Sequence, residues 1–306
     1  MKAKRIFVLL TTIFFCTFCF SQYYFLDKKY YYNYLSWEAG LSSGMMNAFT
    51  DLGGKKGNGK GFIKDLNWNM SRPALGFYLM ANYKEAVGMR AEATFGEVQG
   101  YDSVLKSSDP SLSGRYGRNL SFRSKITDLQ LAFEVHPLFF KWYDEDQSPY
   151  WSPYIVAGIG FFRFNPQGKL GDTWHDLQPL RLEGQGFAEY PDRKPYKLGQ
   201  LNIPIGAGVR YEISSLLHAR LEVVHRLLFT DYLDDVSTSY IDPAYFSNYL
   251  LPGKTGLAQS LYSRMDELQP GYMPREGQQR GDPKDKDAFF TIQLKLGVRL
   301  ANVRRK

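Results

Sequence analysis

The chain has 306 residues, with 38 basic and 31 acidic side chains and a formal net charge of +7. This balance excludes a dedicated nucleic-acid-binding protein, in which basic residues far outnumber acidic ones. Aromatic residues make up 16% of the chain although its mean hydropathy is -0.37, as expected where apolar residues alternate with polar ones instead of forming continuous membrane-spanning helices.

Residues 1–21 predict a secretory signal peptide. Three basic residues among the first five precede an apolar stretch, 6–20, and Ser21 supplies a small residue near the expected cleavage point. The apolar stretch is shorter than the ~20 residues of a membrane-spanning helix, which argues against a membrane anchor. Cys16 and Cys19 leave with the peptide, so the mature chain has neither a disulfide nor a thiolate, and its formal charge falls from +7 to +4.

Eight segments of the mature chain have the two-residue period of a strand with one apolar and one polar face. In the last of them, Phe290, Ile292 and Leu294 alternate with Thr291 and Gln293. Behind a secretion signal, this repetition predicts an all-β protein, an eight-stranded antiparallel transmembrane β-barrel of the outer membrane. A soluble sandwich or a lipocalin-like barrel is the alternative. The predicted strands are 35–49, 72–82, 87–96, 121–135, 154–164, 203–212, 217–227 and 289–300.

The connections between these strands alternate in length. Short or intermediate connections, at 83–86, 136–153 and 213–216, are typical of periplasmic turns. Four long connections are the predicted extracellular loops, and soluble domains seldom have four of such length. The even strand number places the segment 22–34 and the tail 302–306 in the periplasm and the barrel, with its loops, at 35–301. The extracellular loops are 50–70, 97–120, 165–200 and 230–287.

Charged side chains recur on the polar, inward face of the strands. Eight strands enclose a space just wide enough for side chains to fill it, and the mixed signs predict a neutralised network in a filled lumen. This interpretation excludes a porin and a conduit for polypeptides, and it places function at the two rims. The alternative is that the charges only hold the barrel together. The predicted lumen network consists of Glu38, Arg90, Glu92, Asp128, Glu134, Arg210, Glu212, Arg220, Glu222, Lys295 and Arg299.

No catalytic set is evident in the sequence. A lipid A deacylase barrel would need a serine two residues after His225, near the outer end of its strand, and the chain has Leu227 there. His136 lies at a turn, His175 lies in a loop, and His218 starts a strand with no serine and acid nearby. We therefore predict no enzymatic activity, no cofactor and no small-molecule substrate.

Three acidic residues near the start of the last long loop are candidate ligands for a metal ion. Asp231, Asp234 and Asp235 could bind calcium, but the glycine turn and the ordered ligand spacing of a calcium loop are absent. Without a mature cysteine and with scattered histidines, the sequence predicts no metal cluster. We expect these carboxylates to form the solvated base of a loop.

Several segments resemble, in order, the PorG-like outer-membrane barrels of type IX protein secretion. The resemblance covers most of residues 35–242, and its strength lies in the collinearity of the segments. It departs from the family at the C-terminal residues 301–306 and in the long loop after residue 240. The segments are Leu52-Gly53-Gly54, 118–124 (RNLSFRS), 153–166 (PYIVAGIGFFRFNP), 177–180 (LQPL), 183–186 (EGQG) and 229–237 (FTDYLDDVS).

The resemblance implies a non-catalytic accessory component of the secretion machinery, with a periplasmic ring of a lipoprotein and its partner protein docked below the barrel. The turn at 137–151 is then the strongest candidate for docking, since aromatic and basic residues there precede an acidic run. The alternative function is a surface adhesin or recognition barrel whose long loops bind an external ligand. The candidate docking residues are Phe139, Phe140, Lys141, Trp142, Asp144, Glu145 and Asp146.

Overall fold

The computed structural model describes residues 35–53, 67–105, 115–141, 149–214 and 216–300. The predicted signal peptide, the segment 22–34 and the tail 302–306 lie outside these residues, as do Trp142, Asp144, Glu145 and Asp146 of the predicted docking turn. Within the described ranges, no helix is long and apolar enough to cross a membrane.

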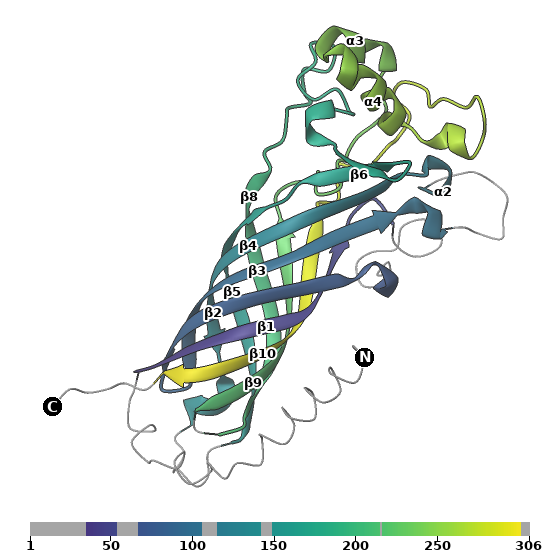
Figure 1. Ribbon diagram of the computed structural model, residues 1–306. Helices are drawn as coiled ribbons and strands as arrows, with labels where there is room; N and C mark the ends of the chain where they lie inside the picture. The colour runs from purple at the N-terminus through teal and green to yellow at the C-terminus, as the bar shows by residue number, and fades with distance from the viewer. Residues whose placement is uncertain (1–34, 54–66, 106–114, 142–148, 215, 301–306) are drawn as a thin grey trace, which may run out of the picture.

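Eight long strands form a closed antiparallel barrel (Figure 1). Each strand pairs with its neighbour around the barrel, and the last strand pairs with the first, where Glu38 lies opposite Arg299, so the sheet has no open edge along the wall. The predicted fold class is therefore confirmed. The barrel strands are β1 (Leu35–Phe49), β2 (Arg72–Tyr83), β3 (Val87–Tyr101), β4 (Ser121–Val135), β5 (Trp151–Arg163), β8 (Gly199–Glu212), β9 (Leu217–Leu228) and β10 (Ala288–Leu300).

The strands begin and end within three residues of their predicted positions, with two exceptions: β8 begins at Gly199 and not at residue 203, and β3 ends later than predicted. The prediction ended β3 at residue 96, but the strand continues to Tyr101 because residues 97–101 pair with the first residues of β4. The outward positions in this extension are Glu97 and Gln99, so the apolar alternation stops while the backbone pairing goes on. Regular structure also occurs inside the predicted loop 165–200, where β6 (Pro166–Leu170) pairs with β4 and with β7 (Thr173–Asp176).

The connection between β2 and β3 is a tight turn that places a carboxylate at the end of the lumen. Lys84 and Glu85 both have positive φ, 53° and 57°. Two successive residues with positive φ form the turn that matches the twist of a β-hairpin. This turn lies at the periplasmic end and places the Glu85 side chain beside the bottom of the barrel interior.

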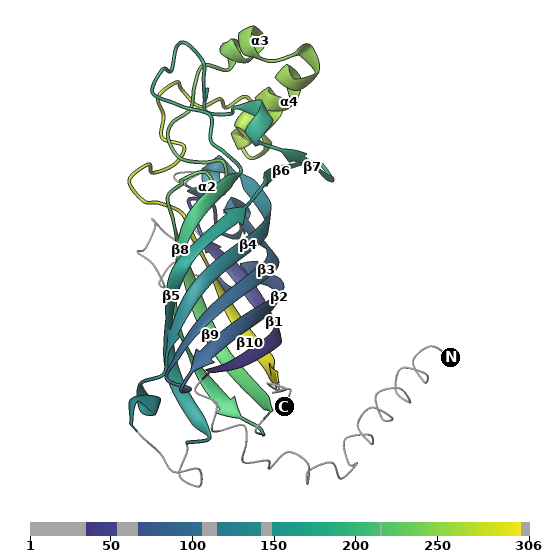
Figure 2. The same cartoon turned by 90° about the vertical axis from the view of Figure 1, so that its left-hand side faces the viewer.

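Segments 165–198 and 229–287 fold together above the extracellular mouth, and we name them the headpiece (Figures 1 and 2). They contain α3 (Phe246–Tyr249) and α4 (Pro252–Tyr262), where Pro252 suits the first helical position because its missing N–H has no partner there. The Tyr262 hydroxyl donates to the Ile241 carbonyl at 2.6 Å. The two longest loops thus share a hydrophobic core of their own, formed by Leu177, Leu180, Leu182, Phe187, Tyr240, Ile241, Phe246, Ala258, Leu261, Tyr262 and Met265.

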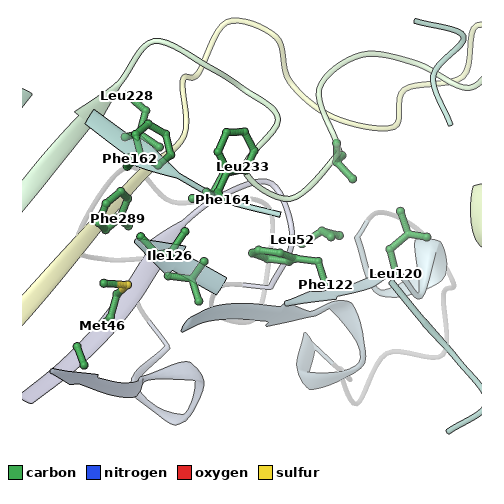
Figure 3. Packing of buried hydrophobic residues seen from close by; sticks show 13 residues of the cluster. Met46, Leu52, Leu120, Phe122, Ile126, Phe162, Phe164, Leu228, Leu233 and Phe289 are labelled. Carbon is green, nitrogen blue, oxygen red and sulfur yellow. The ribbon is translucent and has the colours of Figure 1, made fainter. Parts of the chain in front are cut away.

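Apolar side chains close the outer mouth of the barrel below the headpiece (Figure 3). The ring of Phe162 lies 5.3 Å from that of Phe164 and 5.7 Å from that of Phe289, so three aromatic rings cross the opening. We name this cluster the apolar plug. Its buried members are Met46, Leu52, Ala74, Val98, Leu120, Phe122, Ile126, Phe162, Phe164, Leu228, Leu233, Val236 and Phe289.

Candidate functional site

A buried charge cluster fills the centre of the lumen. The Arg90 guanidinium donates to Glu222 at 2.8 and 3.0 Å, contacts Glu92 at 3.0 Å and also donates to Glu134. Lys295 contacts Glu92 at 2.6 Å and Glu222 at 2.8 Å. All five side chains are fully buried. Such burial is tolerable because each charge has opposite charges within hydrogen-bond distance.

A second layer surrounds Glu38 toward the periplasmic side. Arg220 donates to both carboxylate oxygens of Glu38, and the Tyr78 hydroxyl donates to the same carboxylate at 2.6 Å. His218 Nδ1 lies 3.2 Å from Glu38. The Arg220 guanidinium also lies over the Tyr78 ring, 5.5 Å from its centroid. This one carboxylate of β1 therefore binds groups from both β2 and β9.

Glu85 closes the periplasmic end of the lumen, a role the sequence analysis missed. Its carboxylate accepts from Arg210 at 2.7 Å and from Arg299 at 2.9 Å. Burial acts to raise the pKa of Glu85, but the two guanidinium groups outweigh it and lower that pKa to about 2. The guanidinium of Arg210 also lies over the ring of Phe139, 5.1 Å from its centroid.

The outermost polar layer lies just below the apolar plug. Arg226 donates to Asp128 at 3.0 Å and to the Thr291 hydroxyl at 2.6 Å, and Asn202 donates to Asp128 at 2.8 Å. The Arg226 guanidinium lies 5.4 Å from the centroid of the Phe289 ring. The polar lumen therefore ends where the plug begins.

The structure places the eleven predicted lumen residues as follows. Glu212 is only partly buried, because it lies at the periplasmic end of β8. Asp128 pairs with Arg226 and Asn202, and Arg210 and Arg299 pair with Glu85. The other seven contact one another in the layers described above. The ten buried residues are Glu38, Arg90, Glu92, Asp128, Glu134, Arg210, Arg220, Glu222, Lys295 and Arg299. Residues that the prediction omitted complete these layers: Tyr78, Glu85, Tyr154, Asn202, His218 and Arg226.

One histidine does have a serine and an acid beside it, contrary to the sequence analysis. His136 Nδ1 lies 3.1 Å from the Ser152 hydroxyl, and Nε2 lies 3.3 Å from Glu134. Sequence inspection missed the set because Ser152 comes from the neighbouring strand, β5. Ser152 is 1% exposed and its hydroxyl is also within 3.3 Å of the Pro153 carbonyl, so no substrate reaches it without opening the barrel. Its role in this arrangement is to satisfy the buried imidazole.

A second buried polar site, which we name the junction, joins the barrel to the headpiece. Arg118 donates to Asp102 at 2.8 and 2.9 Å. Glu183 accepts from the backbone N–H groups of Ser237 and Thr238, each at 3.0 Å, and from Arg280 at 2.9 Å. These contacts tie the headpiece segments to the barrel mouth. The junction consists of Asp51, Asp102, Arg118, Glu183, Asp231, Asp234, Asp235, Arg280 and Asp287.

The acidic residues after β9 are buried, so their prediction as a solvated loop base is wrong. Asp231, Asp234 and Asp235 are 3%, 0% and 0% exposed. Asp234 accepts from the backbone N–H groups of Leu52 and Val236 at 3.0 and 2.9 Å. Asp231 accepts from the Ser237 hydroxyl at 2.7 Å and Asp235 from the Tyr196 hydroxyl at 2.6 Å. Each buried carboxylate therefore has a hydrogen-bond donor within the loops.

The junction holds more acidic than basic groups, and the pKa values of several of its aspartates are raised. Burial raises the pKa of Asp231 and of Asp235 to about 7 and that of Asp51 to about 6. Burial, reinforced by neighbouring carboxylates, raises the pKa values of Asp234 and Asp287 well above their usual range. A cavity of about 10 Å³ beside Asp234 has room for one water molecule but for no organic ligand.

The outer wall of the barrel is apolar. Leu41 and Ile159, for example, are 70% and 68% exposed, and Tyr83, Trp151 and Tyr211 form an exposed aromatic girdle at the periplasmic ends of the strands. A soluble barrel would place its polar face outward. This barrel is apolar outside and charged inside, which is the arrangement of a barrel surrounded by lipid. The protein is an integral outer-membrane β-barrel.

Solved structures of other proteins are similar to this outer-membrane barrel. One is Ail, the attachment invasion locus protein of Yersinia pestis, in complex with the heparin analogue sucrose octasulfate, with 9% sequence identity over 87% of this chain and 97% of that chain and a TM-score of 0.35. Another is Neisserial surface protein A, with 8% identity over 88% of this chain and 98% of that chain and a TM-score of 0.37. A third is the N-terminal β-barrel domain of Pseudomonas aeruginosa OprF, with 9% identity over 88% of this chain and 98% of that chain and a TM-score of 0.33. No protein-family model and no curated protein matches the sequence. The strand pairing itself carries the fold assignment, and at these scores the matches add no argument about function.

Part of the predicted docking turn is described and lies at the periplasmic rim of the outer-membrane barrel. The helical turn η6 (Pro137–Phe140) follows β4. Phe140 is 66% exposed and Lys141 is exposed, whereas Phe139 is partly buried against Arg210. Phe140 therefore presents an exposed aromatic ring at the periplasmic rim.

The structure also places His225, the histidine that a deacylase mechanism would use. His225 lies on the outward face of β9, where its ring is 5.8 Å from that of Phe49, and the position two residues on is Leu227, which is 42% exposed on the same face. Among the described residues, no group of three or more His, Cys, Asp or Glu side chains is arranged to hold a metal ion.

Proposed function

We propose that this outer-membrane barrel is a non-catalytic accessory component of type IX protein secretion machinery that docks a periplasmic, lipoprotein-containing ring at the outer membrane. One observation carries the proposal. The segments that resemble PorG-like barrels lie far apart in sequence, yet Leu52, Arg118, Glu183 and Asp234 all belong to or contact the junction. Collinear segments that meet in one buried site are the pattern expected of a shared structural unit, which supports the resemblance.

The filled lumen supports an accessory role in preference to a conduit. Three kinds of interaction cross the interior, namely the Glu85 pairs, the central charge network and the apolar plug. A polypeptide could pass only if all of them separated. The exporting channel in such machinery must then be a different protein, and this barrel acts through its rims.

Affinity purification from mildly solubilised outer membranes tests the docking role. The test variant replaces Asp144, Glu145 and Asp146 with Lys, and we expect it to lose co-purification of a ring-forming lipoprotein and its partner. The matched control makes the same three charge reversals in the headpiece, at the exposed residues Asp172, Asp192 and Asp285. Equal ring recovery from both variants would remove the turn from the docking site, and failure to recover any ring from the unaltered protein would refute the secretion role.

A second candidate function is recognition of an external ligand by the headpiece. The observation that favours it is the hydrophobic core of the headpiece, because a packed core presents a binding surface in a fixed geometry. Leu251 and Met273 are 72% and 53% exposed on this platform. The Tyr240 N–H donates to the Gln278 carbonyl at 2.9 Å, so the intervening segment can be replaced by a short linker. Under the recognition role this replacement abolishes ligand binding, and under the docking role it leaves ring recovery unchanged.

A further inference from the structure

Charge is distributed unevenly over the outer wall. Among the outward-facing positions of the eight barrel strands, charged side chains occur only near the extracellular ends of β3, β4 and β5, at Glu97, Arg123, Lys125 and Arg163. Lys197, just before β8, extends the group. Arg123 is already engaged, since it donates to Gln167 and stacks on a tryptophan ring. The remaining cations lie on three adjacent segments of one side of the barrel, where β4, β5 and β8 are neighbours (Figure 2).

Lys125, Arg163 and Lys197 all point away from the lumen. Each is exposed, and each is flanked in sequence by two side chains that point inward. Lys125 and Arg163 lie within strands, where successive side chains alternate between the two faces. Lys197 precedes β8, but the Phe164 N–H donates to the Leu198 carbonyl at 2.9 Å, so the pairing with β5 continues beyond Gly199. All three side chains therefore point toward the surrounding lipid and solvent. The flanking pairs are Ser124 and Ile126, Phe162 and Phe164, and Tyr196 and Leu198.

Strand register brings these three cations together. Arg163 lies opposite Thr127 on β4 and opposite Gly199 on β8. Lys125 and Lys197 are two residues beyond those partners, on the extracellular side of each. They are therefore diagonal neighbours of Arg163, at the roughly 7–8 Å separation that long side chains span.

The level of the three cations relative to the membrane is fixed by the residues below them. Leu129, Phe161 and Leu201 are the last apolar side chains on β4, β5 and β8, and they are 51%, 48% and 63% exposed. The next outward charges on the same segments are the three cations. They stand where acyl chains give way to headgroups, a position from which lysine and arginine reach into the polar layer.

The three side chains also lack protein partners. Within the described part of the chain, no ion pair or hydrogen bond engages the ammonium groups of Lys125 and Lys197 or the guanidinium of Arg163. Two carboxylates lie nearby, because Glu97 is opposite Lys125 in the register and Asp176 accepts from Asn165 and Gln167. Neither forms an ion pair with the cations, so their positive charge is left for another anion.

We propose that Lys125, Arg163 and Lys197 form a binding site for the phosphate groups of a phosphorylated glycolipid in the outer leaflet. Its acyl chains lie against the apolar wall directly below. Phosphate is the anion that fits, since it offers several acceptor oxygens to cations at this spacing and is fixed by the bilayer at this level. A site of this kind holds a lipid on one side of the barrel and fixes the depth of that side in the membrane.

Native mass spectrometry of the full mature protein, purified in mild detergent and incubated with bisphosphorylated lipid A, tests the proposal. The test variant is Lys125→Gln/Arg163→Gln/Lys197→Gln. We expect a loss of lipid affinity on the order of tenfold or more, since each cation near an anionic surface contributes several-fold. The matched control removes three exposed headpiece charges, Lys194→Gln/Lys254→Gln/Lys284→Gln, and should bind as the unaltered protein does.

Three further measurements test whether the variants are folded, whether positive charge alone is needed and whether the lipid phosphates are needed. Heat-modifiable mobility in electrophoresis shows whether each variant is folded, and Lys125→Arg/Lys197→Arg, which keeps the charge, should retain binding. Dephosphorylated lipid A should bind weakly and equally to all variants. The proposal is overturned if the triple variant binds like the control or if dephosphorylated lipid binds as well as the phosphorylated form. It is also overturned if the unaltered protein binds inorganic phosphate as tightly as it binds phosphorylated lipid A, because the site would then select free phosphate and not the lipid.

Discussion

Replacing Arg90 with methionine should strongly destabilise the barrel, because Arg90 is the cation shared by three buried carboxylates. Methionine fills a similar volume without a charge. Lys295 still contacts Glu92 and Glu222 in the variant, but Glu134 loses its closest cation. Removing one partner of a buried charge pair costs about 3–5 kcal/mol, because the other charge stays buried without compensation. We expect the free energy of unfolding of Arg90→Met to fall by that amount.

Urea unfolding of the protein reconstituted in lipid vesicles, followed by tryptophan fluorescence and by electrophoretic mobility, measures this loss. Arg275→Met is the control, since Arg275 is exposed in the headpiece and its loss should change stability by about 0.5 kcal/mol or less. The double variant Arg90→Met/Glu134→Gln should recover part of the loss, because it also removes the uncompensated charge. A variant Arg90→Met that unfolds within about 1 kcal/mol of the unaltered protein would refute the view that this network stabilises the barrel through mutual compensation.

Three further predictions concern the plug and the junction. Phe289→Ala should lower the free energy of unfolding by about 3–5 kcal/mol in the same assay, since it leaves a cavity in the apolar plug. Glu183→Ala should speed proteolytic cleavage of the headpiece, whereas Asp192→Ala, at an exposed position, should not. Burial raises the pKa of Asp235 to about 7, above its ordinary 3.8, so its contribution to headpiece stability is present below pH 4 and is lost as the pH rises to about 7. Amide hydrogen exchange in α4, corrected for its intrinsic pH dependence, should accelerate across that window and respond less in Asp235→Asn.

The barrel wall could be predicted from sequence because lipid imposes a simple rule on it. Most outward side chains between the two interfaces are apolar, so the two-residue period is visible wherever a strand crosses the membrane, as at Leu41 and Ile159. Charged residues in these strands must then lie on the opposite, inward face, and ten of the eleven predicted there are buried in the structure. The rule stops at the interface, which is why the end of β3 was misplaced at the point where Glu97 and Gln99 face outward.

The partners of those charges could not be predicted in the same way. Glu85 lies in a turn, where the two-residue period gives no inward or outward assignment. Tyr78 and Tyr154 occupy inward positions, but an aromatic residue on the polar face is also compatible with the girdle. The contact of His136 with Ser152 depends on the pairing of β4 with β5, which a single sequence does not specify.

The headpiece was the least predictable part, for a related reason. Its core joins residues near Leu180 to residues near Tyr262, and the helices α3 and α4 are short. The sequence predicts a solvated run of acids after β9, because carboxylates are seldom fully buried without partners. The partners are the backbone N–H groups of Leu52 and Val236 for Asp234, and the hydroxyl groups of Ser237 and Tyr196 for Asp231 and Asp235. None of these pairings can be recognised in the sequence.

The three ways in which the lumen is closed have a consequence for function. The Glu85 pairs depend on charge in a periplasmic turn, the central network on mutual compensation of buried charges, and the apolar plug on close packing of rings such as Phe162. A single substitution removes one of these and leaves the other two intact. Arg90→Met should therefore weaken the barrel without making it conduct ions in a planar bilayer. Closure of this kind separates the two rims, so a partner at the periplasmic turn and a ligand at the headpiece act on independent surfaces.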